Sequence, residues 1–187
     1  EISPDLLIFL EGRFGDRDTK LQGGYDTKIL TVSKDYPFYI DAYGDGRNLM
    51  VAYSFKRELP PITALTSVKS YNVTGGAEYN LSEKLQLRTH GSFSRDTTST
   101  QNENLTLSAL IYEAMRFTDP ARVYNIFGNG DDNHPETLAY ILTDRFYKTR
   151  FSLYEAQSLL EGEAVQLPGG DVRFALGGSY RKEKAWT

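Results

Sequence analysis

The feature that most constrains this chain is a strict alternation between apolar and polar residues in several separate segments. From Val172 to Arg181, the even positions carry Val, Phe, Leu, Gly and Tyr, whereas the odd positions carry Arg, Ala, Gly, Ser and Arg. Successive side chains of a β-strand point to opposite faces, so this period of two predicts a strand with one apolar face. Similar alternation and turn signals predict strands near 6–16, 49–58, 62–80, 85–97, 149–161 and 171–182.

The connections between these strands fall into two classes of length. The segments 82–84 and 166–170 are short and polar, as in β-hairpins. The loops 17–47 and 98–147 are much longer than ordinary connections. We expect two short helices in the second loop, with Ser108 and Asn133 as their N-caps. Short turns at one end of a sheet and long loops at the other are typical of outer-membrane β-barrels.

Strand 49–58 needs separate treatment, because only Leu59-Pro60-Pro61 separates it from strand 62–80. Proline cannot donate a hydrogen bond to a β-ladder, so it ends the strand. If 62–80 runs toward the turn at 82–84, then 49–58 runs away from that turn. We therefore expect 49–58 to belong to a hairpin outside the main wall of strands.

Composition excludes some classes of protein and leaves others open. The 187 residues are 40% hydrophobic and 25% charged, which is typical of a folded chain. The net charge of −4 and the scattered basic residues do not indicate a nucleic-acid partner. Cysteine is absent, so there is no disulfide framework or thiol nucleophile. No apolar run approaches the roughly 18 residues of a membrane-spanning helix, but a membrane-spanning strand needs only about 9 to 11 alternating residues.

Several motifs occur in an order that resembles large TonB-dependent outer-membrane receptors. One is the loop Phe117-Thr-Asp-Pro-Ala-Arg-Val-Tyr-Asn-Ile-Phe-Gly-Asn-Gly130, followed by His134-Pro-Glu-Thr-Leu-Ala139. Another is the hairpin Gln166-Leu-Pro-Gly-Gly-Asp-Val-Arg-Phe-Ala-Leu-Gly-Gly-Ser-Tyr-Arg181. The strand Tyr71-Asn-Val-Thr-Gly-Gly-Ala-Glu-Tyr-Asn-Leu81, the strand at 85–95 and the loop Gly44-Asp-Gly46 fall in matching order. The resemblance covers nearly the whole chain.

The resemblance implies an all-β fold, an antiparallel up-and-down meander. Residues 1–187 would be an internal segment of a barrel of about 22 strands, the class of plugged transporters. The energy-coupling box and plug of the family are not found in this sequence, so we expect a piece of a longer polypeptide. The implied function is energy-coupled uptake of a scarce nutrient, such as a siderophore or carbohydrate, across the outer membrane of a Gram-negative bacterium.

Three kinds of interaction follow from this resemblance. They are binding of a small nutrient, coupling to the TonB energising complex through the missing plug, and contact with outer-membrane lipid. The charge balance adds the expectation that the chain binds no nucleic acid. Barrel loops of the family contribute part of the ligand site, and aromatic rings suit both siderophores and sugars. We therefore expect ligand contacts from the loop aromatics, although these rings could instead pack the loops together. These residues are Tyr36, Phe38, Tyr39, Tyr43, Tyr124 and Phe127.

The sequence shows no motif for catalysis, a metal or a cofactor. A nucleophile elbow, a phosphate-binding loop and a metal-binding histidine pair are all absent. One cluster does contain potential metal ligands, namely Asn129, Asp131, Asp132, His134 and Glu136. Its spacing matches no EF-hand, and Asn, Asp and Gly are ordinary turn residues. Asp41 and Asp45, on either side of Gly44, are a second pair of potential metal ligands, and they match no metal-binding motif either. We expect neither an enzyme nor a metal site.

An alternative interpretation is a soluble, secreted or surface β-sandwich that binds a ligand. In that case the apolar faces of the strands would form the protein's own core. The polar faces argue for the barrel, because several carry Ser, Thr, Asn, Ala and Gly where a soluble sandwich would carry many charges. An isolated segment of a barrel would also have two open edges and an uncovered apolar face. We therefore expect such a segment to associate with itself.

Overall fold

β-Strands dominate the computed structural model, which describes residues 4–128 and 130–187. The strands are β1 (Leu6–Gln22), β2 (Thr27–Val32), β3 (Leu49–Ser54), β4 (Thr63–Ser82), β5 (Leu85–Thr106), β6 (Leu142–Leu167) and β7 (Gly170–Trp186). The helices are the 3-10 turn η1 (Phe55–Arg57), α1 (Ser108–Ala114) and α2 (Pro135–Ile141). Within the described residues, no helix is both long and apolar enough to cross a membrane.

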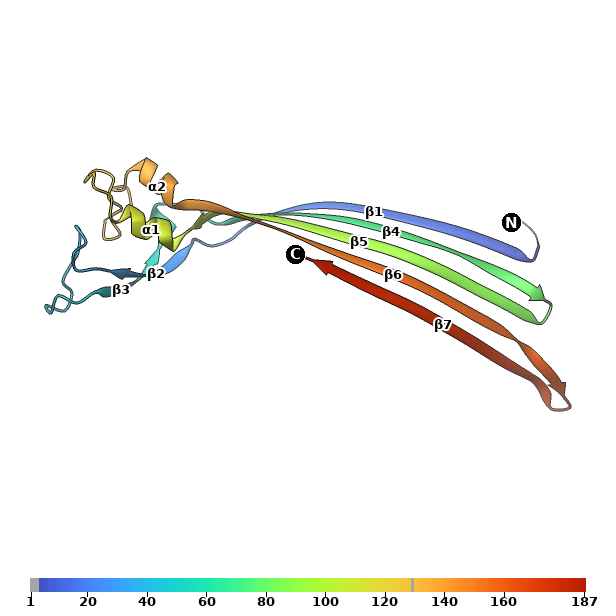
Figure 1. The fold of residues 1–187 in the computed structure, drawn as a ribbon. Coiled ribbons are helices and arrows are strands. Elements are labelled where there is room, and N and C mark those ends of the chain that lie inside the picture. The colour runs from blue at the N-terminus through green and yellow to red at the C-terminus, as the bar shows by residue number, and fades with distance from the viewer. Residues whose placement is uncertain (1–3, 129) are drawn as a thin grey trace. The chain divides into compact units, whose positions relative to one another are not determined.

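The chain divides into two compact units. We call the first the sheet unit, which comprises the residues up to Asp18 together with 67–99 and 147–187. We call the second the loop unit, which comprises residues 19–66 and 100–146. The strands are arranged in the order β1-β4-β5-β6-β7 in one sheet, while β2 pairs with β3 in another (Figure 1). The prediction of an all-β meander is therefore confirmed at the level of strand order.

Two tight turns join the strands of the sheet unit at one end. Glu83 and Lys84 connect β4 to β5, and Pro168 and Gly169 connect β6 to β7. Gly170 has a φ of 131°, a conformation that residues with a side chain rarely adopt. The two hairpins lie where the alternation predicted them, and they are tighter than expected because the strands continue to the turns.

Contacts between neighbouring strands define an apolar face of the sheet unit. Phe14 packs against Tyr71 with ring centroids 5.2 Å apart, and Phe93 packs against Tyr154 with centroids 5.0 Å apart. The register between β6 and β7 and the alternation along each strand extend this face across the sheet. The apolar face comprises Ile8, Leu10, Phe14, Tyr71, Val73, Leu87, Phe93, Tyr154, Leu160, Phe174, Leu176 and Tyr180.

The opposite, polar face of the sheet unit carries most of its charges. Its residues include Glu11, Arg13, Thr74, Glu78, Arg88, Ser92, Glu155, Glu161, Glu163, Arg173 and Arg181. On β7, the polar face carries Arg173 and Arg181. The apolar face carries Phe174, Leu176 and Tyr180, as the alternation predicted. A β-bulge between Glu163 and Val165 shifts the register next to the 168–169 turn.

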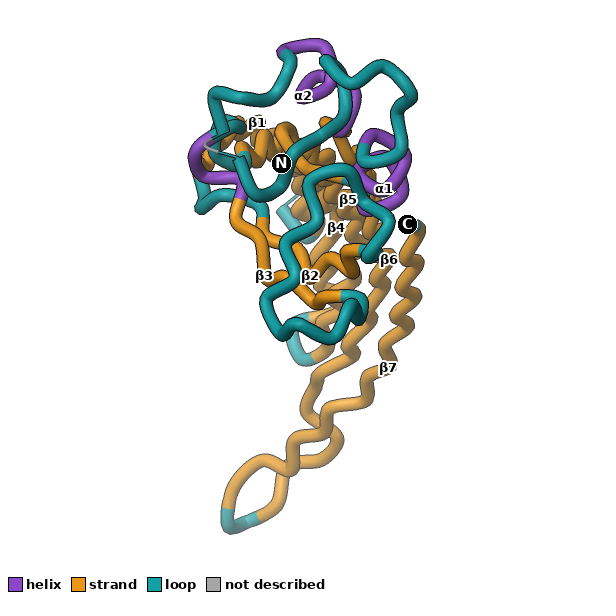
Figure 2. Tube along the Cα trace, turned by 90° about the vertical axis from the view of Figure 1, so that its left-hand side faces the viewer, coloured by secondary structure: helices purple, strands orange, loops and turns teal. Residues whose placement is uncertain are grey.

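The loop unit contains the hydrophobic core. Every buried hydrophobic side chain among the described residues belongs to this unit. Leu30 pairs with Val51 and Val32 pairs with Leu49, so one face of the β2–β3 sheet contributes to the core. α1 and α2 add Ile111 and Ile141, which are fully buried. Figure 2 shows these two helices and the β2–β3 sheet among the loops.

The structure corrects the predicted loops. Residues 17–22 continue β1, and 27–32 form β2 inside the loop predicted at 17–47. The second predicted loop, 98–147, shortens because β5 continues to Thr106 and β6 begins at Leu142. Strand 49–58 ends at Ser54 and turns into η1. It lies outside the five-stranded sheet, as expected, but its partner β2 was not predicted.

Both predicted helix caps shift by one residue. Leu107, not Ser108, is the N-cap of α1, and it forms no side-chain cap hydrogen bond. His134, not Asn133, caps α2, because its Nδ1 atom accepts a hydrogen bond from the Glu136 backbone N–H at 3.2 Å. Asn133 instead holds the preceding loop, since its side chain exchanges two hydrogen bonds with the backbone of Asn125. Proline at the first position of α2 is favourable there because this position needs no donor.

Candidate functional site

Ion pairs cross the polar face of the sheet unit from strand to strand. Glu163 on β6 is the central acceptor, because it lies 3.2 Å from Lys84 on β5 and 3.3 Å from Arg173 on β7. Arg88 approaches Glu161 at 3.3 Å in the same way. Each of these pairs is solvent-exposed, so it contributes at most about 1 kcal/mol. The pairs therefore make the face polar and charge-balanced more than they stabilise it.

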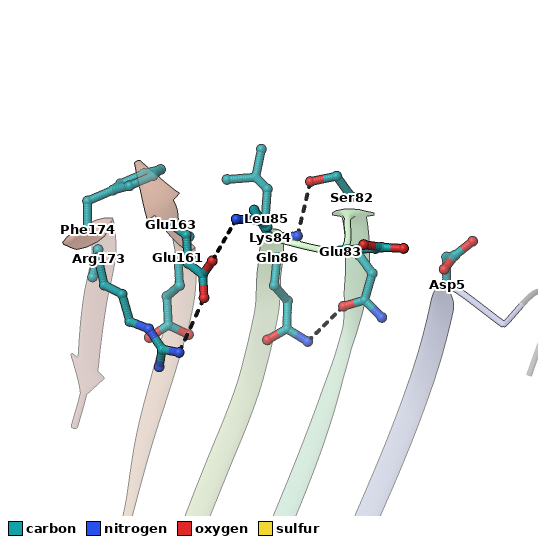
Figure 3. Close-up of a pocket in the computed structure, with 13 residues that line it drawn as sticks. Asp5, Ser82, Glu83, Lys84, Leu85, Gln86, Glu161, Glu163, Arg173 and Phe174 are labelled. Atoms are coloured by element: carbon teal, nitrogen blue, oxygen red, sulfur yellow. Dashed lines mark hydrogen bonds and ion pairs between the residues drawn. The ribbon is translucent and has the colours of Figure 1, made fainter. Parts of the chain in front are cut away.

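The polar face carries a shallow depression at its turn end, shown in Figure 3. Its volume is about 790 Å³. Lys84 bridges toward Glu163, and Gln86 donates a hydrogen bond to Asn80 at 3.1 Å. The lining residues Asp5 and Glu83 add carboxylates on the other side of the depression. This surface is wide, open and mixed in charge, which suits contact with a polar macromolecular surface more than capture of a small molecule.

The apolar face of the sheet unit is open along its length. Leu10 on β1 is 79% exposed and Leu176 on β7 is 69% exposed. Large exposed apolar surfaces are rare on soluble monomers and mark sites of contact with protein or membrane. The period of two in the sequence predicts this row of residues, and the structure leaves it uncovered within the sheet unit.

Two of the six predicted ligand contacts are core residues of the loop unit. The Tyr36 hydroxyl donates a hydrogen bond to the Tyr124 carbonyl at 2.5 Å and accepts one from the Ile126 N–H at 3.2 Å. Burial raises the pKa of Tyr36 to about 12. Tyr36 therefore holds its own loop against the segment around Tyr124, and its hydroxyl stays protonated.

Tyr124 belongs to a partly buried hydrogen-bond network that is centred on Glu58. The Tyr124 side chain is fully buried, and its hydroxyl donates to Glu58 Oε2 at 2.6 Å. The Tyr53 hydroxyl donates to the other oxygen of Glu58. Burial raises the pKa of Glu58, and the hydrogen bond from Tyr124 only partly offsets this effect. Burial and the neighbouring Glu58 raise the pKa of Tyr124 as well.

The remaining predicted contacts range from half-buried to exposed. Phe127 lies 6.4 Å from the Tyr36 ring, and the Tyr39 hydroxyl donates to the Arg47 carbonyl at 2.7 Å. Phe38 is 36% exposed and packs edge-on against Tyr36. Tyr43 is 66% exposed, with the Arg47 guanidinium 3.8 Å above its ring. Phe38 and Tyr43 are thus the two predicted contacts with the most accessible rings.

Neither potential metal cluster gathers its carboxylates around a common point. No group of three or more metal-ligating side chains occurs among residues 4–128 and 130–187. Asn129 of the first cluster lies outside the described residues. Asp41 uses both carboxylate oxygens on its own loop, where they accept from Gly44 N at 2.7 Å and Gly46 N at 3.2 Å. Gly44 and Gly46 have positive φ angles, so this loop is built by ordinary turn chemistry.

A groove of about 470 Å³ in the loop unit was not predicted from the sequence. It lies between the free edge of β2 and the end of α1, where Tyr112 accepts a hydrogen bond from the Thr31 N–H at 3.0 Å. The sequence signal that could have found this edge is the run of β-branched residues in β2, namely Thr27, Ile29, Thr31 and Val32. The Gly and Pro residues on either side of β2 are typical of loops, and for this reason the whole segment was predicted to be a loop.

Comparisons with protein-family models, curated proteins and solved structures found no match for this chain.

Proposed function

We propose that this chain is part of the β-barrel wall of a TonB-dependent outer-membrane receptor, which takes up a scarce nutrient with energy from the TonB complex. The observation that carries the proposal is the two-faced sheet unit. Its apolar face has exposed residues on β1, β4 and β7 and half-buried ones on β5 and β6, while its polar face carries ion pairs between strands. A barrel wall needs this combination, because one face contacts lipid and the other faces a wet lumen.

Aromatic side chains on the apolar face support the same proposal. The Phe14–Tyr71 and Phe93–Tyr154 pairs lie on adjacent strands. Charged residues replace apolar ones on this face at the level of Tyr154, where Lys182 lies opposite it on β7, and beyond that level at Arg95 and Lys184. Aromatic rings at the border between an apolar band and charged residues are typical of a membrane interface.

In the proposed receptor, the loop unit helps to bind the nutrient. Tyr36 and Tyr124 keep the loops in place, while Phe38 and Tyr43 present accessible rings to a siderophore, carbohydrate or similar molecule. The proposal includes no catalytic step.

The alternative of a soluble sandwich receives less support. A sandwich buries the apolar face of one sheet against a second sheet about 10 Å away. The sheet unit by itself has one layer, and the buried hydrophobic residues of the described chain all lie in the loop unit.

The proposal can be tested with single cysteines, because the chain has none. We would introduce Leu176→Cys on the apolar face and Ser179→Cys on the polar face of the same strand, and label each with bimane. The chain would be purified in dodecyl maltoside, and brominated dodecyl maltoside would then be added as a quencher. We expect strong quenching at position 176 and little at position 179, because detergent replaces lipid on the apolar face only.

Ser179→Cys serves as the matched control, since it tests the same strand, label and detergent. Equal quenching at both positions would contradict the proposal. A monodisperse chain in buffer without detergent would favour the soluble sandwich.

A further inference from the structure

Basic residues cluster on the apolar face of the sheet unit, at the level of the Phe93–Tyr154 pair and just beyond it. In the register, Tyr154 lies opposite Lys182, Ser152 opposite Lys184, and Arg150 opposite Trp186. Arg95 on β5 joins them, because its Nε donates to Ser152 Oγ at 3.3 Å. These contacts place four cations from three neighbouring strands on one face. We call Arg95, Arg150, Lys182 and Lys184 the cationic rim.

The cationic rim differs from the basic residues of the polar face in its partners. Five cations of the polar face each form an ion pair with a carboxylate, and they are Arg13, Lys84, Arg88, Arg173 and Arg181. The rim cations form no such pair with any described residue. Asp16 on β1 also lies on the apolar face, and Lys69 pairs with it at 3.6 Å. The rim therefore presents four positive charges that the sheet unit does not neutralise.

Aromatic rings hold three of the rim cations close to the apolar face. The Arg95 guanidinium lies 5.3 Å from the Phe93 ring, and the Lys184 ammonium lies 5.8 Å from the Tyr154 ring. The Arg150 guanidinium lies 5.9 Å from the Trp186 ring. Cation–π contacts of this kind orient the charged groups without neutralising them. The charges are thus fixed at the border of the apolar face and are available to an external anion.

We propose that the cationic rim binds the phosphate-bearing headgroups of anionic lipids. This inference rests on the proposed function, because it takes the apolar face as the surface that contacts acyl chains. The rim then lies at the level of the headgroups, where Arg and Lys bind phosphate oxygens through charge-assisted hydrogen bonds. A soluble anion would not need cations placed next to an apolar surface, so the lipid headgroup is the occupant that satisfies both parts of the site.

The test uses Trp186, the only tryptophan of the chain, as a reporter beside Arg150. The full chain in dodecyl maltoside would be titrated with brominated phosphatidylglycerol or with brominated phosphatidylcholine. We expect phosphatidylglycerol to quench Trp186 at a several-fold lower mole fraction than phosphatidylcholine. The several-fold preference should fall to about one when both rim lysines are removed, and it should shrink at high salt.

The matched control is on the same strand. K182Q/K184Q removes two charges from the rim, and R173Q/R181Q removes two charges from the polar face of β7. The rim variant should lose the preference for phosphatidylglycerol, and the control variant should keep it, with far-UV circular dichroism confirming that both are folded.

The outcomes separate this inference from the proposed function. Equal quenching by the two lipids would overturn the inference and leave the lipid-facing wall intact. Loss of the preference in both double variants would overturn it too, because net charge alone would then explain the binding. Quenching by neither lipid, in a chain that also shows no bimane quenching at position 176, would contradict the lipid-facing wall itself.

Discussion

At the scale of single residues, the partly buried carboxylate of Glu58 organises the loop unit. Two tyrosine hydroxyls from different segments, Tyr53 and Tyr124, donate to its oxygens. A partly buried carboxylate that loses one of these donors loses part of the compensation for its desolvation. Glu58 therefore links the end of β3 to the segment that contains Tyr124.

Tyr124→Phe should destabilise the loop unit by about 1 to 3 kcal/mol, because it removes a donor to a partly buried carboxylate. Hydrogen exchange of the amides in the loop unit would measure this change as a lower free energy of opening. Tyr43→Phe is the control, since the Tyr43 side chain is 66% exposed and lies outside the core. Equal effects of the two substitutions would show that the network around Glu58 contributes little.

Glu58 should also make the stability of the loop unit depend on pH. Burial raises its pKa above the ordinary value of 4.5, so the folded state binds its proton more tightly than the unfolded chain does. This contribution to stability is complete below the unfolded pKa and is lost as pH rises through the folded pKa. Glu58→Gln should reduce the fall in opening free energy between about pH 4 and about pH 7. A variant with the same pH profile as the parent would exclude Glu58 as the source.

At the scale of strands, glycine permits close approach between neighbours in the sheet unit. A Cβ atom on Gly76 of β4 would lie 2.5 Å from the Thr89 carbonyl oxygen and 2.7 Å from the Phe9 ring. Real Cβ atoms do not come this close to backbone, so the Phe9 ring and the strand backbone occupy the space that a side chain would need. Gly178 of β7 has nothing within 4 Å of its Cβ position.

Gly76→Ala should therefore destabilise the sheet by about 1 to 3 kcal/mol through overpacking. Gly178→Ala, at an open position in the same sheet, should be nearly neutral or slightly stabilising. Urea unfolding in detergent, followed by far-UV circular dichroism, would compare the two variants. If Gly76→Ala unfolded at the same urea concentration as Gly178→Ala, the close packing of Phe9 over Gly76 would not hold in solution.

At the scale of the whole molecule, the two faces of the sheet unit should respond differently to an added charge. On a lipid-facing strand, arginine near the centre of the bilayer costs about 2 to 4 kcal/mol, whereas a lumen position tolerates it. Leu176→Arg should therefore reduce the free energy of folding into phosphatidylcholine bilayers, and Ser179→Arg should change it little. Similar effects at both positions would mean that the two faces see the same solvent.

The strand faces and the two hairpins could be predicted from the sequence, because each depends on local chemistry. A period of two sorts the residues from Val172 to Arg181 onto two faces in any extended strand. The short segments at 83–84 and 168–169 each separate two alternating runs by only two residues, which predicts a β-hairpin. The ends of the strands could not be predicted in the same way. β1, β5 and β6 continue into polar segments, where hydrogen bonds to a neighbouring strand stabilise the extended backbone without a local sequence pattern.

Only the tertiary structure decided which aromatic residues are buried and which charges find partners. Tyr36, Tyr124 and Tyr43 are equivalent in sequence as loop tyrosines, yet the first two lie in the core and the third is exposed. Arg181 and Lys182 are adjacent in the chain, yet Arg181 pairs with Glu155 across the strand while Lys182 belongs to the cationic rim. The physical reason is that burial and ion pairing depend on contacts between residues far apart in sequence, and the register of neighbouring strands determines those contacts.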